Sequence, residues 1–393
     1  MQVDAAPFDP QAPALSSRYI QDVVSLPPYR GEGDLWLAVL EQHLATRTYD
    51  LLIPCCDRSI LALNHHRARF AGQCLAVPDV HAIPILFDKL AVKELAGNVG
   101  VPVAAGRSLF AQDNVETLVQ AFGLPLLVKP RASYKLDQMD TRGKVVVARN
   151  VDEITEALGD VHRPSEFMVE EYFEGYGGGL STLSHKGEVL LAFQHRRLKE
   201  PRTGGGSSLR ESVAVDPVML AACARILHAL DYTGVCMFEF RQAHDRADWI
   251  LVEINARFWG SLPLPVSLGV DFPFQLLEMM TGETVGAQPT YAQPPYTVGV
   301  KGRNMLIGAY DTLFKDRKSV GSLVPLMRDL GGLALHPFKL LIGSETSDVW
   351  VGDDLKPAFA EIFSLPRVVR ARSGAVGAVL PSSKIVADTA MKR

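Results

Sequence analysis

The sequence predicts an α/β region followed by a larger α+β region, and two observations support this. In the first region, a helix pattern, a short strand and a second helix pattern follow one another, the rhythm of a small parallel α/β domain. From about residue 167, strands follow one another through short turns containing Gly or Asp, which indicates an antiparallel sheet interrupted by one helix at 218–230. We therefore expect an N-terminal α/β domain over 1–85, a central domain over 86–290 and a weakly patterned C-terminal extension over 291–393.

The composition narrows the classes of function. The 393 residues are 47% apolar and 21% charged with a net charge of −4, enough chain for two or three domains. A negative net charge argues against a nucleic-acid-binding surface, and no run reaches the roughly 18 apolar residues of a membrane span. The N-terminus has no signal-peptide pattern. The five cysteines include no CxxC pair, so we expect reduced thiols in the cytoplasm.

The first region predicts two helices around a short strand. Residues 34–47 carry apolar side chains at helical spacing, and residues 49–57 (YDLLIPCCD) predict a buried strand that runs into a loop with Asp57. The segment after it predicts a second helix. Residues 87–103 predict a further helix, whose end is marked by Gly100 and Pro102.

The next segment carries strand and helix patterns in turn. Residues 124–130 (LPLLVKP) predict a short strand that ends on Lys129 and Pro130. A loop of mixed charge follows from Arg131 to Gly143. Residues 144–149 predict another strand, and the phrase VDEITEAL after it predicts a helix.

A hairpin near the middle of the chain carries the strongest chemical signal. The phrases VCMFEFR (235–241) and WILVEIN (249–255) predict two strands that flank a polar turn. Because side chains alternate across a strand, Glu253 and Asn255 share one face, together with Leu251.

The hairpin also brings two carboxylates together. If the turn centres near residue 245, Glu239 lies opposite Leu251 and diagonal to Glu253. Two carboxylates about 4 Å apart repel by about 4 kcal/mol at an effective dielectric of about 20, so they require a proton, a cationic partner or a metal. Acid and amide oxygens favour Mg²⁺ or Mn²⁺. The alternative is a salt bridge from Glu253 to a nearby arginine, with Asn255 capping a turn.

Two lysines and one strand end suit a nucleotide. Lys89 and Lys129 each stand at an element boundary, where a point charge suits a phosphate, although each could equally be a solvated surface residue. The strand in MVEEYFEG (168–175) can offer a backbone C=O and N–H to an adenine edge. The alternative for Glu170 and Glu171 is an ordinary edge strand with its charges outward.

Taken in order, these motifs resemble the ATP-grasp superfamily. The resemblance covers roughly residues 85–285 and rests on the phrases FDK, LPLLVKP, FMVEEYFEG, GVCMFEF and LVEINARFWGS. It implies an ATP-grasp fold, with two α+β subdomains around ATP, a lid subdomain at about 105–173 and a Rossmann-like N-terminal domain. The first β-α unit of that N-terminal domain is not recognised, so either the chain is truncated or this domain is reduced.

The resemblance implies a role for each matching residue. Lys89 and Lys129 would contact the ATP phosphates, Glu170 the adenine amino group, and the backbones of Glu171 and Phe173 would form the hinge.

The same resemblance assigns the metal site. Glu239, Glu253 and Asn255 would hold Mg²⁺ or Mn²⁺, and Arg257 would touch the γ-phosphate or the acyl-phosphate. Two departures are evident: Gly177 stands where many members carry a ribose-binding acid, and the lid loop RASYKLDQMDTRGK has a single glycine.

The phrases QHRRLKEPRTGGGSSLRES and RFWGSLPL are most similar to the carboxylate–amine ligase-like, carbamoyl-phosphate-synthase-related branch. That branch implies that ATP phosphorylates a carboxylate and that an amine attacks the acyl-phosphate. Arg196 and Arg202 are the candidate catalytic cations of this segment, and alternation makes His195 and Arg196 face opposite ways. The alternative is a solvent-exposed basic hairpin followed by a loop.

The expected cofactors are therefore ATP and Mg²⁺, and the expected partners are small-molecule carboxylates and amines, amino-acid or peptide-like. A homodimer is left open. Bicarbonate chemistry of the carbamoyl-phosphate or carboxylase type and a non-catalytic ATP-binding module are the competing hypotheses.

Overall fold

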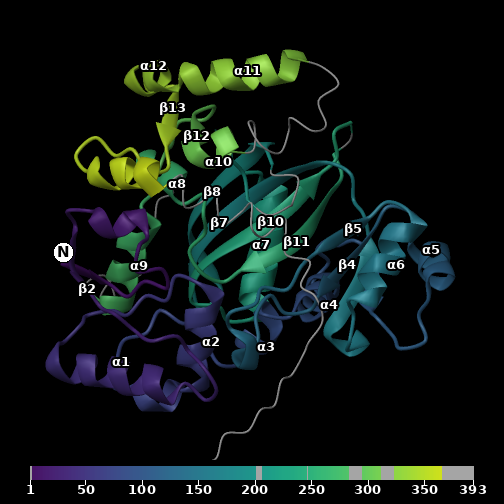
Figure 1. Cartoon of the computed structure of the whole chain (residues 1–393), viewed down its shortest axis with the longest axis horizontal. Coiled ribbons are helices and arrows are strands. Elements are labelled where there is room, and N and C mark those ends of the chain that lie inside the picture. The colour runs from purple at the N-terminus through teal and green to yellow at the C-terminus, as the bar shows by residue number, and fades with distance from the viewer. Residues whose placement is uncertain (1, 201–205, 246, 283–293, 311–322, 365–393) are drawn as a thin grey trace, which may run out of the picture.

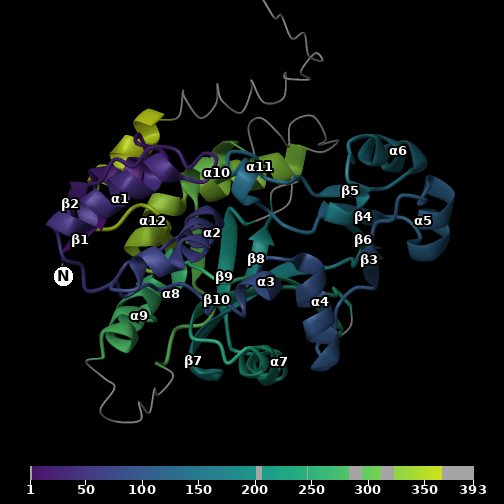
Figure 2. The same ribbon diagram turned by 90° about the horizontal axis from the view of Figure 1, so that it is seen from below.

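The computed structural model describes residues 2–200, 206–245, 247–282, 294–310 and 323–364. A seven-stranded sheet lies at the centre, a four-stranded sheet with two helices lies at one end of it, and the N-terminal segment lies at the other (Figures 1 and 2). The chain therefore combines α/β and α+β parts, as the sequence predicts. Among the described residues no helix is long and apolar enough to span a bilayer.

The N-terminal segment pairs two short parallel strands and packs its helices on a separate core. Its elements are β1 (Val3–Ala5), β2 (Ile20–Val23), α1 (Asp34–Thr46), α2 (Asp57–His65) and α3 (Ile83–Leu86). Trp36 and Ile60 are buried in this core, and so is Met139 from the loop after β4. The strand expected at 49–57 is reduced to one bridge between Leu52 and Leu75, since Pro54 has no N–H to extend a ladder.

The four-stranded sheet lies within the range predicted for the lid subdomain. Its strands run antiparallel in the order β3-β6-β4-β5, and its helices bury Leu118 and Ile154 against them. The elements are β3 (Gly106–Ser108), α5 (Val115–Phe122), β4 (Leu126–Pro130), β5 (Val146–Ala148), α6 (Val151–Gly159) and β6 (Phe167–Glu171).

The seven-stranded sheet has the order β11-β10-β7-β8-β9-β12-β13. Its first five strands are antiparallel, which confirms the expectation for this region. The two last strands come from beyond residue 291 and pair in parallel. The strands are β7 (Tyr176–His185), β8 (Glu188–Lys199), β9 (Leu209–Val213), β10 (Gly234–Gln242), β11 (Trp249–Asn255), β12 (Lys301–Arg303) and β13 (Glu345–Ser347).

Helices cover both faces of this sheet. The helices α4 (Lys89–Asn98) and α7 (Pro217–Ala229) share one buried cluster with Phe238 and Ile254. On the opposite face, α8 (Pro263–Ser267) and α9 (Phe272–Thr281) pack on Met237 and Phe193. The charged residues of β10 and β11 therefore lie on the α8 side of the sheet, where the apolar cover ends.

A β-bulge changes the register of the β10–β11 hairpin. Glu239 pairs directly with Glu253, Phe240 pairs with Leu251, and Val252 between them has no partner. The expectation that Glu239 lies opposite Leu251 is therefore wrong. Leu251 packs in the buried cluster under α4 and α7, on the other face of the sheet from Glu253. The extra residue inserted at the bulge reverses the alternation, and it brings the two carboxylates closer than a diagonal pair.

The C-terminal residues return to the far edge of the sheet. Three helices follow there, α10 (Met305–Tyr310), α11 (Leu323–Ala334) and α12 (His336–Leu341); α12 contacts β13, and α11 contacts α10 and α12. Residues 356–364 form a last helical stretch.

Candidate active site

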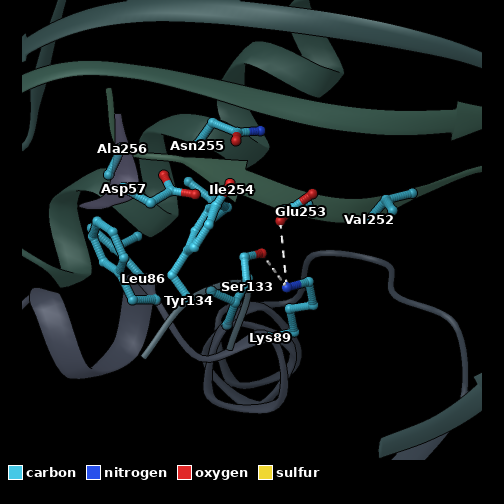
Figure 3. Close-up of a pocket in the computed structure, with 12 residues that line it drawn as sticks. Asp57, Leu86, Lys89, Ser133, Tyr134, Val252, Glu253, Ile254, Asn255 and Ala256 are labelled. Atoms are coloured by element: carbon cyan, nitrogen blue, oxygen red, sulfur yellow. Dashed lines mark hydrogen bonds and ion pairs between the residues drawn. The ribbon is translucent and has the colours of Figure 1, made fainter. Parts of the chain in front are cut away.

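A pocket lies where the N-terminal segment, the lid loop and strand β11 meet. It holds about 480 Å³ of space, counting its open mouth, and Asp57, Lys89, Ser133, Glu253 and Asn255 are among the side chains that line it. Figure 3 shows Lys89 reaching between Ser133 and Glu253, with Asn255 and Asp57 further along.

Lys89 is held at the start of a helix. Asp88 caps α4 by accepting from the N–H groups of Leu90 and Ala91, and it also binds Arg131. Lys89 Nζ donates to Ser133 Oγ at 2.8 Å and lies 3.7 Å from Glu253 Oε1. Burial lowers the pKa of Lys89, and Glu253 opposes that shift. The cation is thus nearly desolvated and aimed at the pocket.

The three candidate metal ligands adjoin one another on β10 and β11. Glu239 Oε1 accepts from Asn255 Nδ2 at 3.1 Å, and Glu253 is the direct strand partner of Glu239. Two carboxylates and one amide oxygen suit a hard cation such as Mg²⁺. The described residues hold no cluster of three or more His, Cys, Asp or Glu placed for a metal, so any such site depends on the amide oxygen of Asn255.

Arg257 lies directly beyond β11. Its Nη2 donates to Asn255 Oδ1 at 2.8 Å, and its Nε donates to Asp57 Oδ1 at 2.5 Å. Although burial lowers the pKa of Arg257, Asp57 together with Glu253 and Glu239 outweighs this effect, so the net shift of the pKa is upward. Sequence reasoning noted Asp57 only as a loop residue, because its contact with Arg257 spans 200 positions.

Of the basic residues on β8, the structure brings Arg197 to the site and leaves Arg196 outside. Arg197 Nη2 donates to Glu239 Oε2 at 2.7 Å, and its side chain is 9% exposed. Arg196 is 50% exposed and binds Glu211. His195 and Arg196 face opposite ways, as alternation predicts, and burial keeps the pKa of His195 well below its usual value. The alternation applied to His195 and Arg196 also puts Arg197 on the inner face.

Arg202 lies outside the described residues.

Lys129 and Glu170 form a buried pair in the lid sheet. Lys129 Nζ lies 2.6 Å from Glu170 Oε1, and Lys93 from α4 lies 2.9 Å from Glu170 Oε2. Burial alone would raise the pKa of Glu170, but the two lysines outweigh it and lower the pKa. Sequence reasoning missed Lys93, although its place one helical turn after Lys89 was a usable signal.

The hinge candidates follow at the end of β6. The N–H of Glu171 donates to the carbonyl of Ala105 at 2.9 Å, so it is already engaged within the lid. Phe173 lies two residues past β6. Both residues remain candidates for the adenine edge.

The glycine at the expected ribose position has a charged neighbour. A Cβ at Gly177 would lie 2.2 Å from Glu200 Oε1 and 2.8 Å from Arg197 Cδ. Glu200 also binds Arg241 at 2.8 Å. An acid therefore stands beside Gly177, supplied by the end of β8 instead of by β7.

Comparison with known proteins agrees with this architecture. Residues 163–301 match a family model described as ATP-grasp in the biosynthetic pathway with Ter operon. The carbamoyl phosphate synthase large chain of Agathobacter rectalis is 22% identical over 273 residues, which cover 64% of this chain and 24% of that protein. The chain thus spans about a quarter of the length of that relative.

Two solved structures share the fold. The biotin carboxylase domain of Hydrogenobacter thermophilus 2-oxoglutarate carboxylase, in complex with MgADP and bicarbonate, matches with a TM-score of 0.56 at 17% identity, over 76% of this chain and 66% of that one. The L-amino acid ligase of Bacillus licheniformis matches with a TM-score of 0.53 at 15% identity, over 72% and 68%. The chain therefore has the ATP-grasp fold, and its residues 163–301 match an ATP-grasp family model.

Proposed function

We propose that the protein is an ATP- and Mg²⁺-dependent ligase that activates a carboxylate as an acyl-phosphate for attack by an amine. The observation that carries this proposal is the convergence, on one side of the sheet, of paired acids and a separate set of cations. Glu239 and Glu253 are adjacent, while Lys89, Arg197 and Arg257 lie beside them. Phosphoryl transfer depends mainly on positioning and on neutralising charge, and this set can supply both.

The proposed role of each residue follows from its position in the site. Glu239, Glu253 and Asn255 would hold Mg²⁺, which would neutralise phosphate charge. Lys89 and Arg257 would orient the transferred phosphate, because both cations border the pocket or touch a residue that lines it. These roles agree with the branch assigned from the sequence, the carboxylate–amine ligase-like proteins.

The lid would hold the rest of the nucleotide. Lys129 would reach a phosphate from β4, and Glu170 with the backbones of Glu171 and Phe173 would read adenine. In the present arrangement Lys129 and Lys93 both bind Glu170, so we expect Lys129 to exchange partners when nucleotide binds. We place the reaction in the cytoplasm, where ATP and Mg²⁺ are available, with small carboxylates and amines as partners.

A hydroxamate assay tests the proposal. The protein is incubated with ATP, Mg²⁺, hydroxylamine and a panel of carboxylates that includes amino acids and dipeptides. Hydroxamate that depends on both ATP and one carboxylate is the expected result. Neither hydroxamate nor ADP across the panel would contradict it and would favour the non-catalytic ATP-binding module.

Bicarbonate is the second candidate acceptor. The similarity to a carbamoyl phosphate synthase chain and to a biotin carboxylase domain solved with MgADP and bicarbonate favours it. ADP release stimulated by bicarbonate, without any hydroxamate from organic acids, would replace the first proposal with this one.

A further inference from the structure

Asp57 belongs to the N-terminal segment, yet it reaches the guanidinium of Arg257. That guanidinium makes three hydrogen bonds with different partners: Nε to Asp57 Oδ1 at 2.5 Å, Nη1 to the carbonyl of Phe258 at 2.9 Å and Nη2 to Asn255 Oδ1 at 2.8 Å. A guanidinium has five N–H donors. One donor on each Nη therefore remains while Nε is held by Asp57.

The carboxylate of Asp57 stands on a rigid support. It is the first residue of α2, and a capping box between Cys56 and Ser59 closes the start of that helix. Ile60 and Leu63, on the same helix, are buried in the N-terminal core. A carboxylate on a packed helix restricts the position of its hydrogen-bond partner more than a carboxylate on a loop does.

Competing carboxylates explain why Arg257 needs such a partner. Glu253 and Glu239 also act electrostatically on Arg257, after Asp57. Without Asp57, the guanidinium would be drawn towards these two acids, which are the candidate metal ligands. Asp57 therefore balances the attraction of the two acids and keeps the Arg257 guanidinium beside the candidate metal ligands instead of against them.

From this geometry we infer that Asp57 is a positioning residue that aims Arg257 at the transferred phosphate. The inference rests on the proposed function, since it needs a nucleotide phosphate at Arg257. The competing explanation is a structural tie between two segments 200 positions apart. A structural tie would affect folding but would not distinguish ATP from ADP.

Nucleotide preference separates these explanations. Calorimetry measures Mg²⁺-dependent binding of ADP and of a non-hydrolysable ATP analogue to wild type, Asp57→Ala and Arg257→Ala. We expect Asp57→Ala to weaken binding of the ATP analogue about tenfold and binding of ADP by less than about twofold. The affinities of Asp57→Ala should therefore approach those of Arg257→Ala. In the double variant, Asp57→Ala should have no further effect on the preference. In the hydroxamate assay kcat should fall about 100-fold, with KM for the carboxylate nearly unchanged.

Three further variants serve as rescue and control. Asp57→Asn keeps the acceptor without the charge and should give an intermediate preference, while Asp57→Glu should restore most of it. Asp113→Asn removes the charge from another close pair, Arg107–Asp113 at 2.7 Å, in the lid subdomain, and should change only the melting temperature. Should Asp57→Ala fail to fold, Asp57→Asn carries the measurement.

The outcomes also distinguish this inference from the ligase proposal. A folded Asp57 variant with the wild-type preference, while Arg257→Ala loses it, would overturn the inference. So would a wild type whose preference does not depend on Arg257. Suppose that the preference for the ATP analogue over ADP needs both Asp57 and Arg257, but no carboxylate gives a hydroxamate. That result would reject the ligase function and still support the role of Asp57.

Discussion

Single residues at the candidate site form one continuous line of contacts across the sheet. From one end to the other, the line runs through Arg241, Glu200, Arg197, Glu239, Asn255, Arg257 and Asp57. Each acid of the line touches at least one arginine, so every charge is balanced while the groups stay near a pocket. Such prearranged charges do not need to reorganise when a phosphate arrives.

Glu253 is the acid closest to Lys89, and its removal gives the first prediction. The change Glu253→Gln keeps the size of the side chain and removes one negative charge from the candidate metal site. We expect Mg²⁺-dependent ADP formation to fall at least about 100-fold, because the neutral amide removes one of the two carboxylate charges that would hold the cation. The melting temperature should change little, since Glu253 is partly exposed.

A Mg²⁺ titration checks this. A higher Mg²⁺ requirement in Glu253→Gln supports the metal role, whereas an unchanged rate and Mg²⁺ dependence would remove Glu253 from the site.

Arg197 and Arg196 are neighbours on β8 with opposite orientations, and they form a matched pair for the second prediction. Arg197→Met should lower ADP formation about 100-fold, because Glu239 and Glu200 lose the cation between them. Arg196→Met should stay within about twofold, since exposed pairs contribute little. Steady-state kinetics measure both. A larger loss in Arg196→Met than in Arg197→Met would restore Arg196 as the catalytic candidate.

At the scale of elements, the glycines of β7 make room for the charged side chains of β8. A Cβ at Gly179 would lie 2.4 Å from His195 Cε1, and one at Gly177 would meet Glu200 and Arg197. Gly178 points to the other side, where the closest atom is the carbonyl oxygen of His195 at 3.2 Å. The two inward glycines therefore let His195 and Arg197 lie across the strand.

This arrangement gives the third prediction. Gly179→Ala should push the ring of His195 away, destabilise the protein by about 1–3 kcal/mol and lower turnover through the neighbouring Arg197. Gly178→Ala, on the same strand, is the control and should reduce both stability and turnover less than Gly179→Ala does. Urea unfolding and ADP formation measure the two effects. Equal losses in the two variants would show that the inward face has no special need for glycine.

Strand alternation and motif order were sufficient to predict most of these elements. The antiparallel strands from Phe167 onwards, the lysine at the start of α4 and the opposite orientations of His195 and Arg196 all followed from local patterns. The bulge at Val252 did not, because nothing in a single strand marks an extra residue that only its partner reveals. The contact of Asp57 was missed for a related reason, since its partner Arg257 is 200 positions away in the sequence.

At the scale of the whole molecule, three segments meet at one pocket. The N-terminal segment supplies Asp57, the lid loop supplies Ser133, and the large sheet supplies Glu253. The lid loop also packs on the N-terminal core through Met139. The N-terminal segment therefore contacts both the pocket and the lid loop that lines it. The domain limits at 85 and 290 remain predictions.

The far edge of the sheet depends on a buried acid, Glu345 on β13. Its carboxylate, 1% exposed, binds Arg303, His336 and Lys339 at 2.7–3.0 Å. Burial alone would raise the pKa of Glu345, but these donors outweigh it and lower the pKa to about 2. The contact joins β12 and α12 to β13, which fixes the C-terminal residues on the sheet.

The pH dependence of this contact gives the last prediction. An unfolded glutamate has a pKa of about 4.3, so the stabilisation is complete above that pH and disappears as the pH falls towards 2. Glu345→Gln should lower the free energy of unfolding by about 3 kcal/mol at pH 7, with the gap to wild type closing below about pH 4. Urea unfolding from pH 7 to pH 3 measures it, with Glu156→Gln on the exposed side of α6 as control. A gap that stayed constant across this range would show that the Glu345 charge does not carry the contact, and that packing of β13 alone holds the edge.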